Sequence, residues 1–257
     1  MAATWVIITG HSRGMGLAMA AQALREGTSV LGISRKKAGE SLPCIATASG
    51  ATLQEWQCDL ADSEAVAERL STWLASVDHG NVTSIALVNN AALLSTPAPL
   101  HVVPTAELIA TLRVGLEAPV LLTRAFLAAT QSWVNDAGWT GQRRVLQISS
   151  GLGRSAMAAV GSYCAIKAGL DNFSASVALD QQQLGEAGAK IVSLAPGIIA
   201  TDMQLQLRSA DGAGFPDQSK FVDFHESGAL DSPESAAAKV LGYLARDDFG
   251  STVIARI

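Results

Sequence analysis

Short apolar runs alternate with longer, Ala-rich stretches along the chain. Residues 5–9 form an apolar, β-branched run, which is typical of a strand that a parallel sheet buries on both faces. Residues 17–25 follow as a predicted Ala-rich helix closed by Gly27, and a second apolar run at 29–33 completes a β-α-β unit. The first 33 residues therefore predict the repeating unit of a parallel sheet.

The same alternation continues to the end of the chain, with no internal repeat and no change of composition that marks a domain boundary. Because crossover helices join parallel strands, this order predicts helices on both faces of one sheet. The expected fold class is α/β: a single Rossmann-type domain over residues 1–257, with a doubly wound, mostly parallel, seven-stranded sheet. Beyond residue 33, strands are predicted at 52–57, 84–88, 144–148, 190–194 and 251–254, and helices at 62–77, 105–112, 116–135, 161–184 and 233–245.

Two segments do not fit this alternation. Residues 36–51 are expected to be an irregular connector, and residues 198–230 form a long polar insertion after a strand end. A connection that long in a compact domain is usually functional, so 198–230 is expected to be a substrate loop, with a decorative insertion as the alternative. Its apolar side chains are expected to line a substrate pocket: Met203, Leu205, Phe215, Phe221 and Phe224.

Composition excludes several classes of function. The chain is 49% hydrophobic and 16% charged, which suits a packed core, and its net charge of −5 disfavours capture of nucleic acid or an anionic membrane. No apolar run is long enough to span a membrane and the start lacks a secretory signal, so a soluble, cytoplasmic protein is expected. Three scattered cysteines and four dispersed histidines predict neither a disulfide framework nor a metal site.

Three glycines with the spacing GxxxGxG stand between the first predicted strand and the first helix. Gly10 permits a sharp turn, and Gly14 and Gly16 allow close approach of the backbone to a pyrophosphate. The N-terminus of the following helix offers free N–H groups to the phosphates. This context predicts a dinucleotide site; a tight turn without a ligand is the alternative.

The residues after the second strand indicate which dinucleotide would bind. A free ribose 2′-hydroxyl would call for Asp or Glu there, but the sequence has Ser34 and Arg35, followed by two lysines. A guanidinium can bind a 2′-phosphate through two bonds, and Arg13 would approach the same phosphate from the glycine turn. NADP(H) is therefore expected rather than NAD(H), with an ordinary solvated basic face as the alternative.

Ser150, Tyr163 and Lys167 form a candidate catalytic group. Tyr163 and Lys167 are four residues apart on a predicted helix and so share one face, while Ser150 follows a strand end at the ligand-binding edge. Reduction of a carbonyl needs a proton donor; a nearby ammonium would lower the phenol pKa, and a hydroxyl would stabilise the developing charge. The alternative is a core tyrosine beside a solvated lysine, although the chain has only two tyrosines.

Taken together, these motifs resemble the short-chain dehydrogenase/reductase family over almost the whole chain. Further matches are Asp59-Leu60, 89–92 (NNAA) and 196–203 (PGIIATDM). Residues 230–234 and the short C-terminus are similar to those of sepiapterin reductases and benzil/diketone reductases. The resemblance implies a homodimer or homotetramer built through the helices at 116–135 and 161–184. The motifs and the family resemblance together predict these cofactor-binding residues: Gly10, Ser12, Arg13, Gly14, Met15, Gly16, Ser34, Arg35, Asp59, Leu60, Asn90, Ala91, Ala92, Tyr163, Lys167, Pro196, Gly197, Ile199, Thr201 and Met203.

Two positions depart from the family pattern. Ala92 stands where the family usually has glycine, so its methyl group could crowd the cofactor. Gly115 stands where an asparagine normally holds a water that links the lysine to solvent, and glycine has no side chain to do so. Either another group supplies this relay or proton transfer is slower.

The expected activity is NADP(H)-dependent hydride transfer between the nicotinamide and a small carbonyl or alcohol, as a reductase of a ketone, aldehyde or diketone. Tyr163 would be the general acid, Lys167 would tune it and Ser150 would polarise the carbonyl. Oxidation of a secondary alcohol or cyclic diol would use the same residues. A non-catalytic NADP(H)-binding sensor is the alternative from another class, and Gly115 is the feature that supports it.

Overall fold

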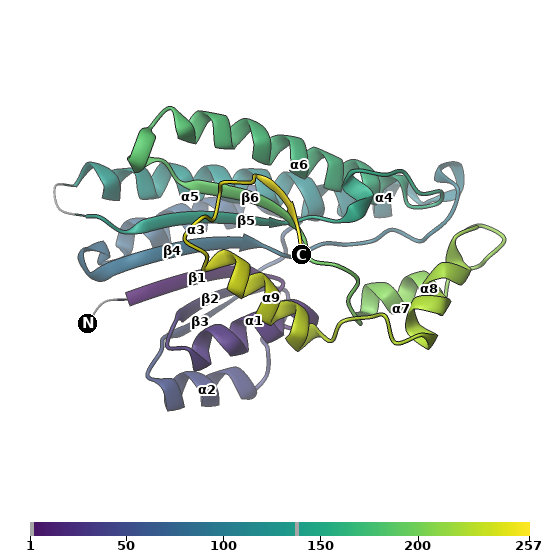
Figure 1. Cartoon of the computed structure of the whole chain (residues 1–257), viewed down its shortest axis with the longest axis horizontal. Helices are drawn as coiled ribbons and strands as arrows, with labels where there is room; N and C mark the ends of the chain where they lie inside the picture. Colours follow the sequence, from purple (N-terminus) through teal and green to yellow (C-terminus); the bar gives the residue numbers. More distant parts are fainter. Residues whose placement is uncertain (1–2, 137–138) are drawn as a thin grey trace.

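The computed structural model describes residues 3–136 and 139–257, and a seven-stranded sheet lies at its centre (Figure 1). The strand order is β3-β2-β1-β4-β5-β6-β7, and each neighbouring pair is parallel. The α/β, Rossmann-type fold class predicted from the sequence is confirmed. The strands are β1 (Ala3–Thr9), β2 (Ser29–Ser34), β3 (Leu53–Gln57), β4 (Val82–Asn89), β5 (Gln142–Ile148), β6 (Lys190–Ala195) and β7 (Ile254–Arg256).

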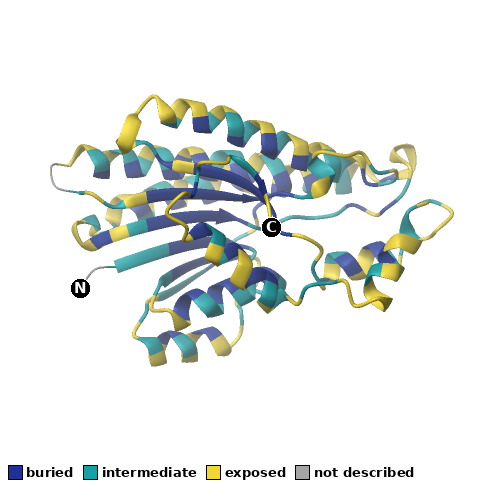
Figure 2. Cartoon of the chain, in the orientation of Figure 1, coloured by how far each residue is buried: buried dark blue, intermediate teal, exposed yellow. Residues whose placement is uncertain are grey.

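Helices cover both faces of the sheet, and two separate cores result because successive strand residues point to opposite faces. In β1, Val6 and Ile8 pack into the core beneath α1, α2 and α9, whereas Ile7 packs into the core beneath α3, α5 and α6. Figure 2 shows the strands as a buried layer between these helices. The helices are α1 (Gly14–Arg25), α2 (Ser41–Ser49), α3 (Ser63–Ser76), α4 (Thr105–Leu112), α5 (Ala118–Asn135), α6 (Gly161–Gln182), α7 (Asp202–Arg208), α8 (Gln218–Glu226) and α9 (Pro233–Leu244).

The chain order places a crevice at the carboxyl ends of β1 and β4. After β1 the chain moves outward to β2 and β3, and then returns to β4 on the other side of β1. Connections diverge at such a switch point, and ligands of open α/β sheets bind there. The glycine turn after β1 and the segment after β4 lie at this position.

The expectation that residues 36–51 are an irregular connector was wrong, because they contain α2. Leu42 and Ala46 are buried, and their spacing of four residues places both on the side that packs into the core with α1. The rest of the helix is rich in Ser, Thr and Ala, and carries Pro43 in its first turn. Two apolar positions are too weak a periodic pattern to reveal this helix.

The polar insertion at 198–230 is a small helical lobe rather than an open loop. It contains α7 and α8, which pack around the fully buried Phe215 in a third core that also includes Val160 and contacts Tyr163. A parallel bridge between Ile199 and Asp231 joins its two ends, through the bonds Ala200 N–H to Asp231 O and Asp231 N–H to Ile198 O. In Figure 1 the lobe projects from the sheet beside its carboxyl edge.

Two further differences are local. The last strand lies at Ile254–Arg256 rather than 251–254, and pairs with β6 in the register Leu194 to Ala255. The predicted helices at 105–112 and 116–135 are continuous, since a π-helical turn over Arg113–Glu117 joins α4 to α5. Over residues 3–136 and 139–257, no helix has both the length and the apolar character that crossing a membrane requires.

Candidate active site

The turn predicted to bind phosphate joins β1 to α1 at the switch point. Gly10 and Gly14 have φ values of +72° and +53°, in the left-handed region that residues with a Cβ rarely adopt. A Cβ on Gly16 would clash with the carbonyl oxygen of Gly10. The backbone therefore closes tightly on itself here, and the N-terminal residues of α1 line a cavity.

The end of β4 holds this turn in place. Thr9 Oγ1 accepts hydrogen bonds from the N–H groups of Asn90 and Ala91, each at 3.0 Å, and the Asn90 amide donates to the Thr9 carbonyl oxygen at 2.9 Å. Thr9 was not among the predicted site residues, although it begins the glycine motif. Ala92 does not have a positive φ, so its backbone conformation is compatible with the methyl group that replaces the usual glycine.

The basic segment after β2 lies at one end of the same cavity. Arg35, Lys36 and Lys37 are exposed there, as the interaction with a 2′-phosphate would require. The Ser34 hydroxyl donates to the Lys36 carbonyl oxygen at 2.6 Å, and so shapes this loop. Asp59 and Leu60 border the cavity from the end of β3.

His11 lies in this region and was not among the predicted site residues. Its ring is fully buried, with Nε2 2.8 Å from Glu55 Oε1 and Nδ1 3.2 Å from Ser34 Oγ. Glu55 also accepts the Ala38 N–H at 2.8 Å, so this pair anchors the loop that carries the basic residues. A glycine within a strand often marks a place where another group packs closely. Gly32 in β2 was therefore the one sequence signal of the buried His11, since a Cβ on Gly32 would clash with the His11 ring.

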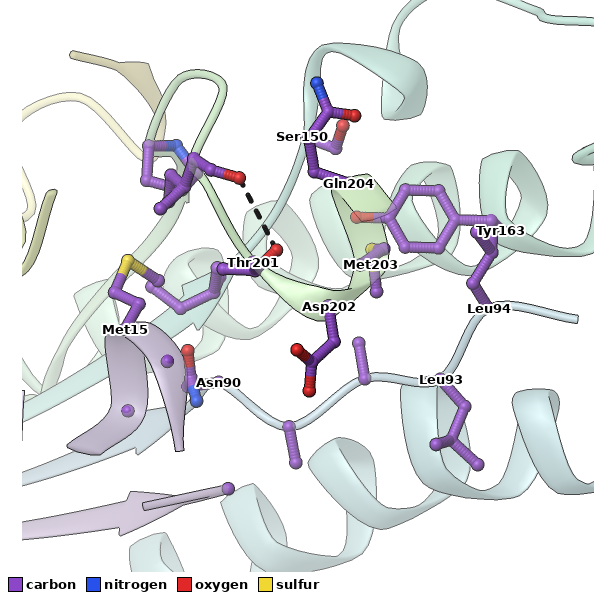
Figure 3. A pocket seen from close by; sticks show the side chains of 18 of the residues that line it. Met15, Asn90, Leu93, Leu94, Ser150, Tyr163, Thr201, Asp202, Met203 and Gln204 are labelled. Carbon is purple, nitrogen blue, oxygen red and sulfur yellow. Dashed lines mark hydrogen bonds between the residues drawn. The ribbon is translucent and has the colours of Figure 1, made fainter. Parts of the chain in front are cut away.

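Arg13 of the glycine turn contacts the helical lobe directly. Its Nη1 is 2.6 Å from Asp202 Oδ2, and both side chains are exposed. Thr201 lies beside the glycine turn, with its Cγ2 3.6 Å from where a Cβ on Gly14 would stand, and donates to the Ile199 carbonyl oxygen at 3.4 Å (Figure 3). Arg13 thus links the turn to α7, and its contact with a 2′-phosphate stays a prediction.

The three predicted catalytic residues lie at the other end of the cavity. Ser150 follows β5, and its Oγ accepts the Leu152 N–H at 3.2 Å. Tyr163 and Lys167 lie on successive turns of α6, with Lys167 Nζ 5.4 Å from the Tyr163 ring centroid. Lys167 Nζ also donates to the Ile148 carbonyl oxygen at 2.6 Å.

A buried carboxylate supports this group from behind. Asp171, one turn after Lys167, accepts hydrogen bonds from the hydroxyls of Ser149 and Ser193, each at 2.6 Å, and from Arg154 Nε at 3.0 Å. These bonds tie α6 to the ends of β5 and β6. Asp171 was not among the predicted site residues, and its spacing of four residues from Lys167 was the only signal.

Burial controls the protonation of the catalytic pair. It raises the pKa of Tyr163 to about 12, although the hydrogen bond with Ser150 lowers this pKa in part. It lowers the pKa of Lys167 to about 8, against the opposing charge of Asp171. The expectation that the lysine lowers the phenol pKa was wrong, because burial dominates this pKa, and Tyr163 holds its proton at neutral pH.

Gly115 packs directly against the catalytic helix. It lies in the π-helical turn, and a Cβ there would stand 2.9 Å from Cγ2 and 3.0 Å from Cδ1 of the buried Ile166. Ile166 therefore fills the space into which a side chain at position 115 would extend. The structure explains why glycine stands here, and its missing side chain leaves the relay without the usual amide.

All the predicted catalytic and cofactor-binding residues line this single cavity of about 1360 Å³. Its inner wall combines those residues with apolar side chains, among them Leu94, Leu152 and Val160. Met203, Leu205, Phe221 and Phe224 from the helical lobe also line it, whereas Phe215 packs inside the lobe. Among the described residues there is no group of three or more His, Cys, Asp or Glu side chains that could hold a metal ion.

A proton-holding phenol beside a buried lysine, facing a cradle of glycines, suits a redox reaction on a small molecule, which is the chemistry of an oxidoreductase. A family model described as short chain dehydrogenase matches residues 4–212. The chain belongs to the short chain dehydrogenase family, as its motifs suggested.

Three relatives show where the chain stands within this family. It is 34% identical to a benzil reductase ((S)-benzoin forming) from Bacillus cereus, over 98% of each chain. It is 32% identical to a protein of the same name from Bacillus subtilis, over 93% of this chain and 92% of that one. A crystal structure of a metagenomic short-chain oxidoreductase in complex with NADP is 27% identical, with a TM-score of 0.70 over 100% of this chain and 96% of that one. The predicted likeness to benzil/diketone reductases is confirmed.

The lysine pKa predicts the pH dependence of catalysis. In the predicted mechanism, a reduction takes a proton from Tyr163, and the Lys167 ammonium would favour this transfer only while it is charged. Because the Lys167 pKa is about 8 and the Tyr163 pKa about 12, the reductive kcat/KM is expected to fall as the pH rises through about 8. The measurement is kcat/KM between pH 6 and 10 at a saturating cofactor concentration; a flat profile across pH 8 would contradict it.

The contact between Gly115 and Ile166 predicts a coupled pair. Gly115→Asn is expected to lower the free energy of unfolding by about 1–3 kcal/mol through overpacking, with no gain in rate. Adding Ile166→Ala should recover part of that loss, so that the two substitutions are non-additive. Denaturant unfolding of both single variants and the double variant measures this, and strict additivity would show that the two sites do not touch.

Proposed function

We propose that this chain is an NADP(H)-dependent carbonyl reductase whose substrate is a small vicinal diketone of the benzil type. The observation that carries the proposal is the shared cavity, which has the glycine turn and basic loop at one end and Ser150, Tyr163 and Lys167 at the other. The 34% identity to a benzil reductase over nearly the full length supports the substrate class.

The residues present fit a dinucleotide. The backbone conformations at Gly10 and Gly14 and the tight closure at Gly16 form a cradle that a Cβ would fill. The N-terminus of α1 faces this cradle, which favours a pyrophosphate. Gly10, Gly14 and Gly16 would hold the pyrophosphate, and Thr201 and Lys167 would hold the nicotinamide end.

When bound, the reduced nicotinamide would supply the hydride for the carbonyl carbon. The Ser150 hydroxyl polarises the carbonyl oxygen by hydrogen bonding, which stabilises the charge that develops there. Tyr163 donates its proton to this oxygen, so that the ketone becomes a secondary alcohol, and the Lys167 ammonium stabilises the resulting phenolate. The apolar walls of the cavity hold the substrate and exclude water.

Two observations support NADP(H) over NAD(H). The loop after β2 presents Arg35 and two lysines to the cavity, anchored by the bond between His11 and Glu55. The related oxidoreductase of known structure was crystallised with NADP.

Two other functions predicted from the sequence differ from carbonyl reduction in what they require of the site. Oxidation of a secondary alcohol or cyclic diol would use the same residues in reverse. A non-catalytic sensor would have no need of Ser150, Tyr163 and Lys167 together in one cavity, and Gly115 is the feature that favours it. A homodimer or homotetramer built through α5 and α6 stays a prediction. Exposed apolar side chains lie on α6 and on α4, which continues into α5: Leu179, Ile109 and Leu112.

Replacing the proposed general acid should slow turnover strongly. Tyr163→Phe is expected to lower the rate of benzil reduction by a factor of about 10²–10⁴ and to change NADPH affinity far less, because the ring stays in place and only the phenol hydroxyl is removed. The matched control is Tyr243→Phe, a change at the other tyrosine, which packs 6.0 Å from Phe249. NADPH consumption against a panel of ketones, aldehydes and diketones measures both; tight NADPH binding without any turnover would favour the sensor.

Replacing Arg35 tests the choice of cofactor. Arg35→Ser is expected to raise KM for NADPH by about 10- to 100-fold and to leave KM for NADH nearly unchanged, because one charge-assisted bond to the 2′-phosphate is lost. Arg25→Ser, at the far end of α1, is the matched control. Equal effects of Arg35→Ser on both cofactors would exclude a 2′-phosphate contact.

A further inference from the structure

Gln204 is a buried amide without a hydrogen-bond partner. It lies on α7, is 4% exposed, and neither Nε2 nor Oε1 has a partner within the described residues. An amide buried in this way costs free energy, and native proteins seldom leave one without a ligand, water or other partner.

Neighbouring glutamines of the same lobe are satisfied. Gln206 Nε2 lies 3.3 Å from the Leu94 carbonyl oxygen and 3.4 Å from that of Ser95, and Gln218 donates to the Arg208 carbonyl oxygen at 2.5 Å. Elsewhere in 3–136 and 139–257, the only other buried side-chain atoms without a partner are one oxygen each on Asn89 and Gln147, whose amide nitrogens both donate to Thr123. Gln204 is distinct because both ends of its amide are unused.

The position of Gln204 points to a ligand. It lines the cavity together with Ser150 and Tyr163, and Figure 3 shows its side chain extending from α7 toward the side of the cavity where Ser150 lies. Its neighbours Met203 and Leu207 also line the cavity and are apolar. Gln204 is therefore a polar group in an otherwise apolar stretch of the substrate wall.

A vicinal diketone has two carbonyl oxygens, and the hydroxyls of Ser150 and Tyr163 can hydrogen-bond only the oxygen of the carbonyl that is reduced. The second oxygen enters the same buried space and needs a donor of its own, because an unpaired carbonyl there would lose its hydration without compensation. The carboxamide N–H of Gln204 is a neutral hydrogen-bond donor that is buried in the wall of the same cavity.

We infer that the Gln204 amide donates a hydrogen bond to the second carbonyl oxygen of the substrate. This contact selects vicinal dicarbonyls over simple ketones and orients the other carbonyl group toward Tyr163. The inference rests on the proposed carbonyl reductase function.

The test compares two substrates of nearly the same shape. Benzil has two adjacent carbonyls between its phenyl rings, and 2-phenylacetophenone has a methylene in place of one of them. Gln204→Met keeps the length of the side chain and removes its donors. It is expected to lower kcat/KM for benzil by about tenfold or more, and for 2-phenylacetophenone by less than about twofold.

Gln206→Met, the same change on the exposed side of α7, is the matched control and should alter neither value. The affinity for NADPH, measured by fluorescence titration, should be unchanged in both variants. For Gln204→Met, equal losses of kcat/KM on the two substrates, or no loss on either, would overturn the inference. Weakened NADPH binding by this variant would also overturn it, because the amide would then contact the cofactor.

The failure of the proposed function has a different signature. If the wild-type protein reduces neither substrate with NADPH, the proposed function fails and the inference with it. If the wild type reduces benzil through Tyr163 and Gln204→Met has no effect, the function stands and only the role of Gln204 is lost.

Discussion

The hydrogen bonds between Thr9 and Asn90 are the constraint on which the rest of the site depends. They join the ends of β1 and β4 at the one place where the chain reverses its direction across the sheet. The glycine turn can close tightly because the Asn90 side chain packs against it. The catalytic half follows from the same register, since β5 pairs with β4 and carries Ser150 to the same edge.

The catalytic half is organised by burial rather than by exposed charge. Lys167 is held between the Ile148 carbonyl oxygen and the field of Asp171, and Asp171 is itself fixed by two hydroxyls and Arg154. In this low-dielectric setting the phenol keeps its proton and the ammonium releases its own more readily than in water. A protonated Tyr163 is the form that its proposed role as a general acid requires.

Local patterns carried most of what could be predicted from the sequence. The alternation of strands and helices, the glycine turn and the pair Tyr163 and Lys167 each depend on residues close in the chain, and the structure brings them to one cavity. The contacts of His11 with Glu55, of Gly115 with Ile166 and of Asp171 with Ser193 join distant segments, so the local sequence gives at most a faint signal of them. α2 and the helical lobe escaped prediction because tertiary burial of a few apolar residues, and not periodicity, stabilises them.

The bridge between Ile199 and Asp231 gives the helical lobe a degree of independence from the sheet. Because its two ends meet, the chain enters and leaves the lobe at nearly one point, and the small core around Phe215 joins the lobe to Val160 and Tyr163. The entropic cost of closing such a segment grows slowly with length, by about 0.6 kcal/mol for each doubling. Residues 201–203 lie beside the glycine turn, whereas Phe221 and Phe224 of α8 line the cavity farther along the lobe. Sequence changes in α8 can therefore reshape the substrate wall with little effect on the cofactor cradle, whereas changes at the start of α7 would alter both.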